Sequence, residues 1–306
     1  MKTLQKTAIS TAAVALLAGL STVAFAADEP AAAPEVSPIT ANVTVASNYI
    51  YRGLTQTNNK PAIQGGFDYA HESGFYVGNW NSNISWISDE NGGRGNSGNT
   101  ATSAPIEMDF YAGFKKELIG EGFASDFGVL QYYYPVSGAV ANAPTASQLS
   151  TNAAGRQSSG AAPSTTELYA AQNFTFGSTT GFFKFSYAVS NLFGIYNSKG
   201  SFYPDLTANY DTGFYGITLN GHVGYQYVPN NIYQAVSNTN GPAGTYNLSY
   251  ADWKLGITKD FGGGLSGSVA YTGTSVQKVG STYMYTTPNG GNQGRANAVV
   301  ALTKTF

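Results

Sequence analysis

Hydrophobic and polar residues alternate along most of the chain. Near the beginning, for example, Val43 and Val45 alternate with Asn42 and Thr44. A period of two places the two kinds of side chain on opposite faces of a β-strand. The pattern predicts twelve strands, at residues 40–52, 61–71, 74–86, 105–116, 122–134, 164–176, 180–190, 202–211, 213–228, 246–260, 264–273 and 296–306. Most have about 10 to 14 residues, which suits a tilted crossing of a bilayer by ~9–11 residues.

The connections between these strands alternate in length. The short ones are residues 71–74, 117–121, 177–179, 211–213 and 261–264, and the long ones are 53–60, 87–104, 135–163, 191–201, 229–245 and 274–295. A membrane barrel has short turns on its periplasmic side and long loops outside the cell. We therefore predict an all-β fold, a transmembrane up-and-down antiparallel barrel of about twelve strands over residues 39–306.

The last strand ends on an aromatic residue at the end of the chain. Val300, Leu302, Lys304 and Phe306 share one face, and a terminal Phe after such an alternation is typical of outer-membrane barrels. We expect the barrel assembly machinery to bind Phe306, and the ammonium of Lys304 to reach the membrane interface.

Aromatic side chains also gather near strand ends. Because barrels carry aromatic girdles at both membrane interfaces, we expect these residues to belong to interfacial girdles. They are Tyr49, Tyr51, Trp80, Trp86, Tyr132, Tyr133, Tyr134, Tyr225 and Tyr227. In the strand predicted at 74–86, Tyr76 and Trp80 fall on the apolar face and Asn79, Asn81 and Asn83 on the polar face.

The N-terminus has the features of an export signal. Lys2 and Lys6 precede the apolar stretch 8–25, and Ala24-Phe25-Ala26 is a cleavage site of the small-x-small type. We predict a signal peptide over residues 1–26, a flexible Ala/Pro-rich segment over 27–38 and a location in the Gram-negative outer membrane. An N-terminal membrane helix is the alternative, but no basic flank follows the apolar stretch.

Composition narrows the function further. Only 10% of residues are charged, with 15 Lys and Arg against 17 Asp and Glu, so no basic excess points to nucleic acid. The absence of Cys excludes disulfides and thiol chemistry. Residues 262–267 match G-x-G-x-x-G, but predicted strands on both sides make this a turn. We expect no cofactor and no metal site.

Two blocks of sequence resemble one family. The first block consists of residues 47–56 (SNYIYRGLTQ), 61–69 (PAIQGGFDY) and 74–80 (GFYVGNW), and the second of 252–256 (DWKLG) and 262–265 (GGGL). Both are similar to the TorF family of porins, also called Gcw_chp proteins. The resemblance spans nearly the whole mature chain. It implies a porin of the proteobacterial outer membrane and assigns no substrate.

Strand parity sorts the charged residues. Nearly all of them fall on the polar face. A charge on the other, lipid-facing side would cost ~2–4 kcal/mol at the middle of the bilayer. The pore-lining candidates are Arg52, Asp68, Glu107, Asp109, Glu167, Asp205, His222, Asp252 and Lys254, and Lys115, Asp126 and Lys184 share their parity. The acids outnumber the bases, which favours neutral or cationic small hydrophilic solutes. The same charges could instead pair and brace the wall, as Arg52 with Asp68.

Two alternatives remain open at this stage. A structural barrel could be plugged by Phe75, Leu130, Tyr132 and Tyr169, or by residues 135–163 folding inward. An outer-membrane hydrolase could use His222, or the pair Glu107 and Asp109, whose spacing of two places both on one face. Paired carboxylates are common on polar pore walls, so we expect a porin and no enzyme.

Overall fold

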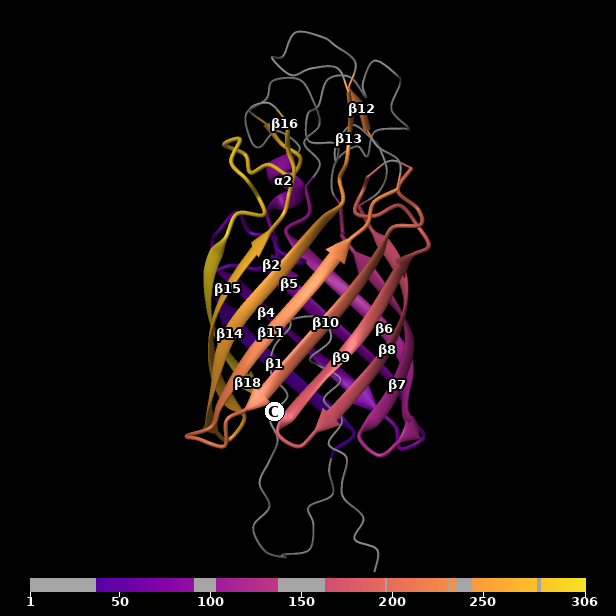
Figure 1. Ribbon diagram of the computed structural model, residues 1–306, viewed down its shortest axis with the longest axis vertical. Coiled ribbons are helices and arrows are strands. Elements are labelled where there is room, and N and C mark those ends of the chain that lie inside the picture. Colours follow the sequence, from indigo (N-terminus) through magenta and orange to yellow (C-terminus); the bar gives the residue numbers. More distant parts are fainter. Residues whose placement is uncertain are drawn as a thin grey trace, which may run out of the picture.

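Twelve antiparallel strands close into a barrel (Figure 1). The computed structural model describes residues 37–90, 103–136, 163–195, 197–229, 232–234, 244–279 and 282–306. The barrel strands are β1 (Ile39–Ala46), β4 (Ala62–Ala70), β5 (Phe75–Asn83), β6 (Ile106–Gly120), β7 (Phe123–Tyr133), β8 (Thr165–Phe176), β9 (Thr179–Ala188), β10 (Phe202–Asp211), β11 (Ile217–Gln226), β14 (Tyr250–Gly262), β15 (Leu265–Thr274) and β18 (Asn297–Thr305). The predicted fold is confirmed. The predicted signal peptide and nearly all of the Ala/Pro-rich segment lie outside the described residues, and both stay predictions.

Pairing between the first and last barrel strands closes the sheet. In that pairing Val45 lies opposite Leu302 and Val43 opposite Lys304. Every other strand pairs with its neighbour in the chain order of the barrel. Three two-stranded sheets lie in the long connections: β2 (Ile50–Tyr51) with β3 (Leu54–Thr55), β12 (Ile232–Gln234) with β13 (Gly244–Tyr246), and β16 (Lys278–Val279) with β17 (Thr282–Tyr283).

Tight turns join the strands at one end of the barrel and long connections join them at the other (Figure 1). Gly122 has a φ of 81° between β6 and β7, a conformation that glycine adopts without steric cost. The short connection predicted at residues 117–121 is only residues 121–122, because β6 continues through an irregularity between Glu117 and Gly120. Lys304 donates from Nζ to the carbonyl oxygen of Gly263 in a short turn, at 2.5 Å.

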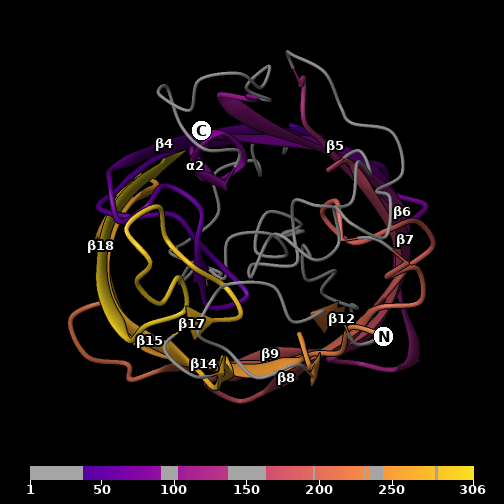
Figure 2. The same ribbon diagram turned by 90° about the horizontal axis from the view of Figure 1, so that it is seen from above.

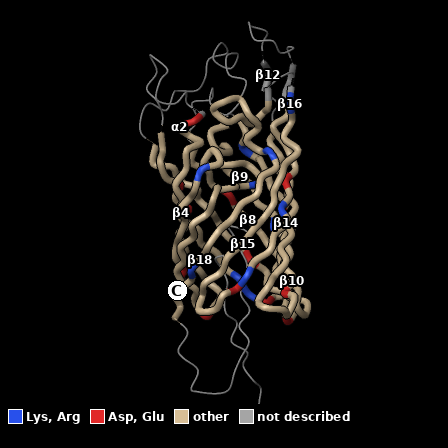
Figure 3. The backbone as a smooth tube through the Cα atoms, turned by 90° about the vertical axis from the view of Figure 1, so that its left-hand side faces the viewer, with Lys and Arg blue, Asp and Glu red and all other residues tan. Residues whose placement is uncertain are grey.

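The outer face of the barrel is apolar. On β15, Val269 and Tyr271 are exposed, and on β18 Val300 and Leu302 are exposed. Charged positions are sparse along the tube (Figure 3). The described ranges contain the short helix α2 (Trp86–Glu90), and none of the helices there has the length and hydropathy to cross a bilayer.

The predicted sidedness of β5 is wrong. Trp80 pairs with Asp109 of β6, so both side chains point into the barrel, and Trp80 is buried. Asn79 and Asn83 face outward, and they are tolerated there because their side chains bond to neighbouring backbone: Asn79 Nδ2 donates to the Asp109 carbonyl at 2.9 Å and Asn83 Oδ1 accepts from the Ile63 amide at 2.7 Å. Aromatic character alone did not reveal which face was lipid-facing.

The same error affects the predicted plug and girdle. Phe75 is on the outer face, 47% exposed, and cannot narrow the lumen, whereas Leu130, Tyr132 and Tyr169 are buried inside. Among the predicted girdle residues, Tyr133, Tyr225 and Tyr227 are exposed. The interior instead contains Tyr49, Trp80, Trp86, Tyr132 and Tyr134, which belong to one buried cluster.

Candidate functional site

The first long connection folds into the barrel. Residues 47–60, which we name the crossbar, contain the β2–β3 hairpin, and its two central residues, Arg52 and Gly53, have φ values of 43° and 76°. Positive φ at both positions is typical of a tight two-residue hairpin turn. The strand predicted over 40–52 therefore ends at Ala46. Seen from above, the purple chain after β1 lies within the ring of strands (Figure 2).

The crossbar reaches several strands of the wall. Tyr49 donates from its hydroxyl to Glu107 Oε1 of β6 at 2.6 Å, and the hydroxyls of Tyr51 and Tyr132 of β7 lie 2.6 Å apart. On the other side, a Cβ on Gly53 would lie only 2.8 Å from Cβ of Asp252 on β14. These contacts carry the hairpin across the lumen.

Arg52 is the central residue of the crossbar. Its guanidinium binds Glu167 of β8 through both nitrogens, Nη1 to Oε1 at 3.0 Å and Nη2 to Oε2 at 2.7 Å, and Nη1 also donates to Gln226 Oε1 at 2.6 Å. The guanidinium carbon lies 4.2 Å from the ring centroid of Tyr203. The side chains of Arg52 and Glu167 are 7% and 2% exposed, so this is a buried bidentate ion pair.

Arg52 does not pair with Asp68, the pairing that parity allowed. Asp68 Oδ1 instead accepts a hydrogen bond from the hydroxyl of Tyr111 at 2.5 Å. The hairpin is the reason, because it places Arg52 inside the barrel, where its guanidinium reaches Glu167 of β8.

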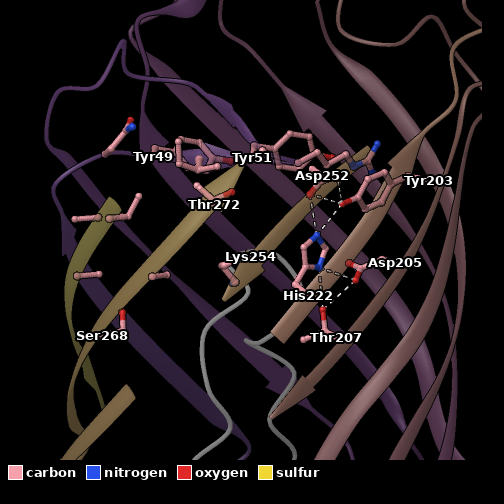
Figure 4. Close-up of a pocket in the computed structure, with 18 of the residues that line it drawn as sticks. Tyr49, Tyr51, Tyr203, Asp205, Thr207, His222, Asp252, Lys254, Ser268 and Thr272 are labelled. Carbon is pink, nitrogen blue, oxygen red and sulfur yellow. Dashed lines mark hydrogen bonds and ion pairs between the residues drawn. The ribbon is translucent and has the colours of Figure 1, made fainter. Parts of the chain in front are cut away.

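A second cluster forms on strands β10, β11 and β14. His222 Nδ1 lies 3.0 Å from Asp205 Oδ1, and His222 Nε2 lies 2.9 Å from Asp252 Oδ1 (Figure 4). Tyr203 donates to Asp252 Oδ2 at 2.9 Å and Thr207 to Asp205 Oδ1 at 2.9 Å. Register produces the cluster, because His222 is paired with Thr207 on one side and Lys254 on the other.

A cavity of about 160 Å³ lies between this cluster and the crossbar. Its wall on β15 and β18 consists of small side chains, among them Ser268, Ala270 and Ala301. The charged residues that line it are Arg52, Lys184, Asp205, His222, Asp252 and Lys254. Figure 4 labels the last four of these. These small side chains leave space inside the barrel that larger ones would fill.

The structure divides the predicted pore-lining residues into two groups. Those that line the cavity are Arg52, Asp205, His222, Asp252 and Lys254. Those that are buried in the barrel without lining it are Asp68, Glu107, Asp109 and Glu167. That either group faces a path for solutes stays a prediction. The acid excess expected of the whole lumen does not hold in the cavity, where three bases other than His222 meet two acids.

Glu107 and Asp109 share a face but not an environment. The oxygens of Glu107 accept hydrogen bonds from Tyr49 and Tyr134, both at 2.6 Å. Asp109 is fully buried, and within the described part of the chain neither of its carboxylate oxygens has a hydrogen-bond partner. In those same ranges, no group of three or more His, Asp or Glu is placed to hold a metal ion.

Sequence reasoning missed Tyr203 and Thr207. Both have the parity of Asp205 on the same strand, and that parity was the signal that could have found them. The crossbar contacts had no such signal, because they depend on where a hairpin turns.

Comparison with solved structures finds other barrels. A KdgM porin in complex with disordered oligogalacturonate matches with a TM-score of 0.45 and 7% identity, over 88% of this chain and 98% of that one. OprD from Pseudomonas aeruginosa matches with a TM-score of 0.36 and 11% identity, over 89% of this chain and 65% of that one. Acinetobacter baumannii OccAB1 matches with a TM-score of 0.41 and 13% identity, over 85% of this chain and 60% of that one. At these TM-scores the likenesses assign no solute to this chain.

Sequence comparison identifies the family. No curated protein sequence matches significantly. The family model described as "Bacterial protein of unknown function (Gcw_chp)" matches residues 29–306, which include every described strand of the barrel. The chain therefore belongs to the Gcw_chp family.

Proposed function

We propose that this protein is an outer-membrane porin that lets small hydrophilic solutes diffuse through its lumen. The observation that carries the proposal is the sidedness of a closed barrel: apolar side chains cover the outside, while charged side chains border an internal cavity. Water-soluble folds bury apolar groups, and the reverse arrangement suits a barrel in lipid.

The nine pore-lining candidates have separate roles in this proposal. Arg52, Asp205, His222, Asp252 and Lys254 border the cavity, where a passing solute would meet them. The other four, Asp68, Glu107, Asp109 and Glu167, are buried and do not line the cavity. In this proposal they position the lining residues or contribute to the electrostatic potential in the cavity. Transport is favoured over hydrolysis because both ring nitrogens of His222 contact carboxylates.

Conductance tests the proposal directly. The mature chain, folded in detergent and added to a planar bilayer in potassium chloride, is expected to produce stepwise increases in current. Detergent without protein and heat-denatured protein serve as controls. A folded, inserted barrel that gives no current at any voltage would contradict a porin and favour a structural barrel.

The location follows from the same proposal. The outer face contacts outer-membrane lipid, the predicted signal peptide directs export, and the short turns lie on the periplasmic side. Phe306 is exposed at the short-turn end, where the assembly machinery would bind it. We expect deletion of Phe306 to lower the amount of barrel in the outer membrane several-fold, whereas Thr305→Ser should not, as measured by fractionation and immunoblotting.

A further inference from the structure

The cavity contains a buried cation, Lys184, which forms no salt bridge within the described part of the chain. Lys184 of β9 lines the cavity and is 6% exposed. Its ammonium lies 4.3 Å from the ring centroid of Tyr169. Within the described part of the chain no carboxylate lies within 4.0 Å of that ammonium. A buried charge without a counter-charge in contact with it is costly, so this site favours an anion supplied from outside the protein.

Three acids lie near enough for their charges to act on Lys184, and each of them binds another side chain. Asp205 is the register partner of Lys184 on β10, but its Oδ1 binds His222 Nδ1 at 3.0 Å and the Thr207 hydroxyl at 2.9 Å. On the other side of β9, Glu167 of β8 is held through both oxygens by Arg52. Asp126 of β7 accepts a hydrogen bond at Oδ1 from the Tyr76 hydroxyl at 2.6 Å. None of the three carboxylates forms a salt bridge with Lys184.

The charges around the cavity point the same way. The cations that line the cavity are Arg52, Lys184 and Lys254, and the anions are Asp205 and Asp252. The charge of Arg52 is already paired with Glu167, which does not line the cavity. His222 sits between those two acids. The remaining interior acids, Asp68, Glu107, Asp109, Asp126 and Glu167, do not line it. The cavity is therefore not an acidic pocket, although the barrel interior holds more acids than bases.

The rest of the lining suits an apolar body. Rings of Tyr49, Tyr51, Tyr132 and Tyr203 face the cavity from the crossbar and the wall, and the alanines of β15 and β18 lie across from them. Aromatic faces and methyl groups bind flat or aliphatic groups by area burial. A ligand that fits this lining has one anionic end and an apolar remainder.

We propose that the cavity binds small organic carboxylates, with the carboxylate on Lys184 and the apolar body against the tyrosine rings. This inference rests on the proposed porin function, because it names the class of solute that would occupy the lumen during passage. It replaces the preference for neutral or cationic solutes that the total charge count favoured.

Current block by three probes of one shape tests the proposal. Benzoate, benzamide and benzylammonium are added in turn to the full mature protein conducting in a planar bilayer. Benzoate is expected to block at a concentration at least about tenfold lower than the other two, since a charge-assisted hydrogen bond discriminates by that order. Lys184→Gln should weaken block by benzoate about tenfold, and Lys184→Arg should retain most of it.

Lys115 supplies the matched control. It has the same interior parity on β6, where it is paired with Asp126, but it does not line the cavity. Lys115→Gln should leave benzoate block as in the wild type. Equal loss in both variants would show a general effect of interior charge and overturn the site.

The remaining outcomes separate the two proposals. Current without benzoate block, or equal block by benzamide, leaves the porin standing and overturns the carboxylate site. Stronger block by benzylammonium would also overturn it. If no current is seen, the porin proposal fails, and calorimetric titration of the folded wild-type barrel in detergent with benzoate and benzamide still decides the site: preference for benzoate supports it and equal or absent binding overturns it.

Discussion

At the scale of single residues, tyrosines packed on glycines organise the barrel interior. The ring of Tyr111 covers Gly78, Tyr76 covers Gly113, and Tyr169 covers Gly128. The hydroxyls of Tyr76 and Tyr169 also hydrogen-bond to each other. Each glycine leaves room for a ring from a neighbouring strand, so large side chains fill the space without pushing the strands apart.

Gly128→Ala tests this packing. A Cβ at Gly128 would lie 2.5 Å from Cζ of Tyr169 and 2.7 Å from the Ala112 carbonyl oxygen, and we expect the overlap to lower the unfolding free energy by about 1–3 kcal/mol. The control is Gly120→Ala, where a Cβ would meet nothing within 4 Å. Urea titration of both variants in detergent measures the difference, and equal midpoints would show that the ring moves aside freely.

Amide substitutions at Asp109 and Glu107, two residues apart on β6, should change the unfolding free energy in opposite directions. Asp109→Asn removes a buried charge that has no hydrogen-bond partner in the described part of the chain, so the unfolding free energy should rise, by about 1 kcal/mol. Glu107→Gln should lower it by about 1–3 kcal/mol, because an amide nitrogen cannot accept the hydrogen bond that Tyr49 or Tyr134 donates. A fall for Asp109→Asn in the same titration would mean that the carboxylate itself stabilises the fold.

At the scale of elements, the twelve wall strands could be predicted from sequence and the crossbar could not. Wall strands repeat the period of two over nine or more residues, except β1 with eight. The crossbar begins with the same period, although the strand ends at Ala46, and positive φ values at Arg52, Gly53, Asn58 and Asn59 then turn the chain. One glycine after an arginine does not tell whether a strand continues outward or turns into the lumen.

Arg52→Ala tests whether the crossbar narrows the lumen. The substitution removes both bonds to Glu167 and the bond to Gln226, so we expect the hairpin to loosen and single-channel conductance to increase, about twofold or more. Leaving Glu167 buried without its partner should also cost about 3–5 kcal/mol of stability. Arg295→Ala, at an exposed position of the last long connection, should change neither quantity. Unchanged conductance for Arg52→Ala in a folded barrel would show that the crossbar does not limit flow.

At the scale of the whole molecule, the sidedness of the wall is what the sequence conveyed best, with β5 as the exception. Strands such as β15 and β18 carry aliphatic residues on one face and small or polar residues on the other, so parity assigned them correctly. On β5 both faces carry residues that parity could place either way, and pairing with Asp109 of β6 decided the matter. Clusters that join several strands, such as His222 with Asp205 and Asp252, depend on register, which alternation alone does not determine.

Substitution on the outer face measures whether the barrel is solvated by lipid. Val269 lies halfway along β15 and is exposed, so Val269→Arg should lower the unfolding free energy in phospholipid vesicles by about 2–4 kcal/mol. Leu118 is equally exposed but lies near the short-turn end of β6, and Leu118→Arg should cost about 0–1 kcal/mol there. Because both residues are equally open to solvent in a water-soluble barrel, equal costs for the two variants would mean that the apolar band does not sit in the bilayer.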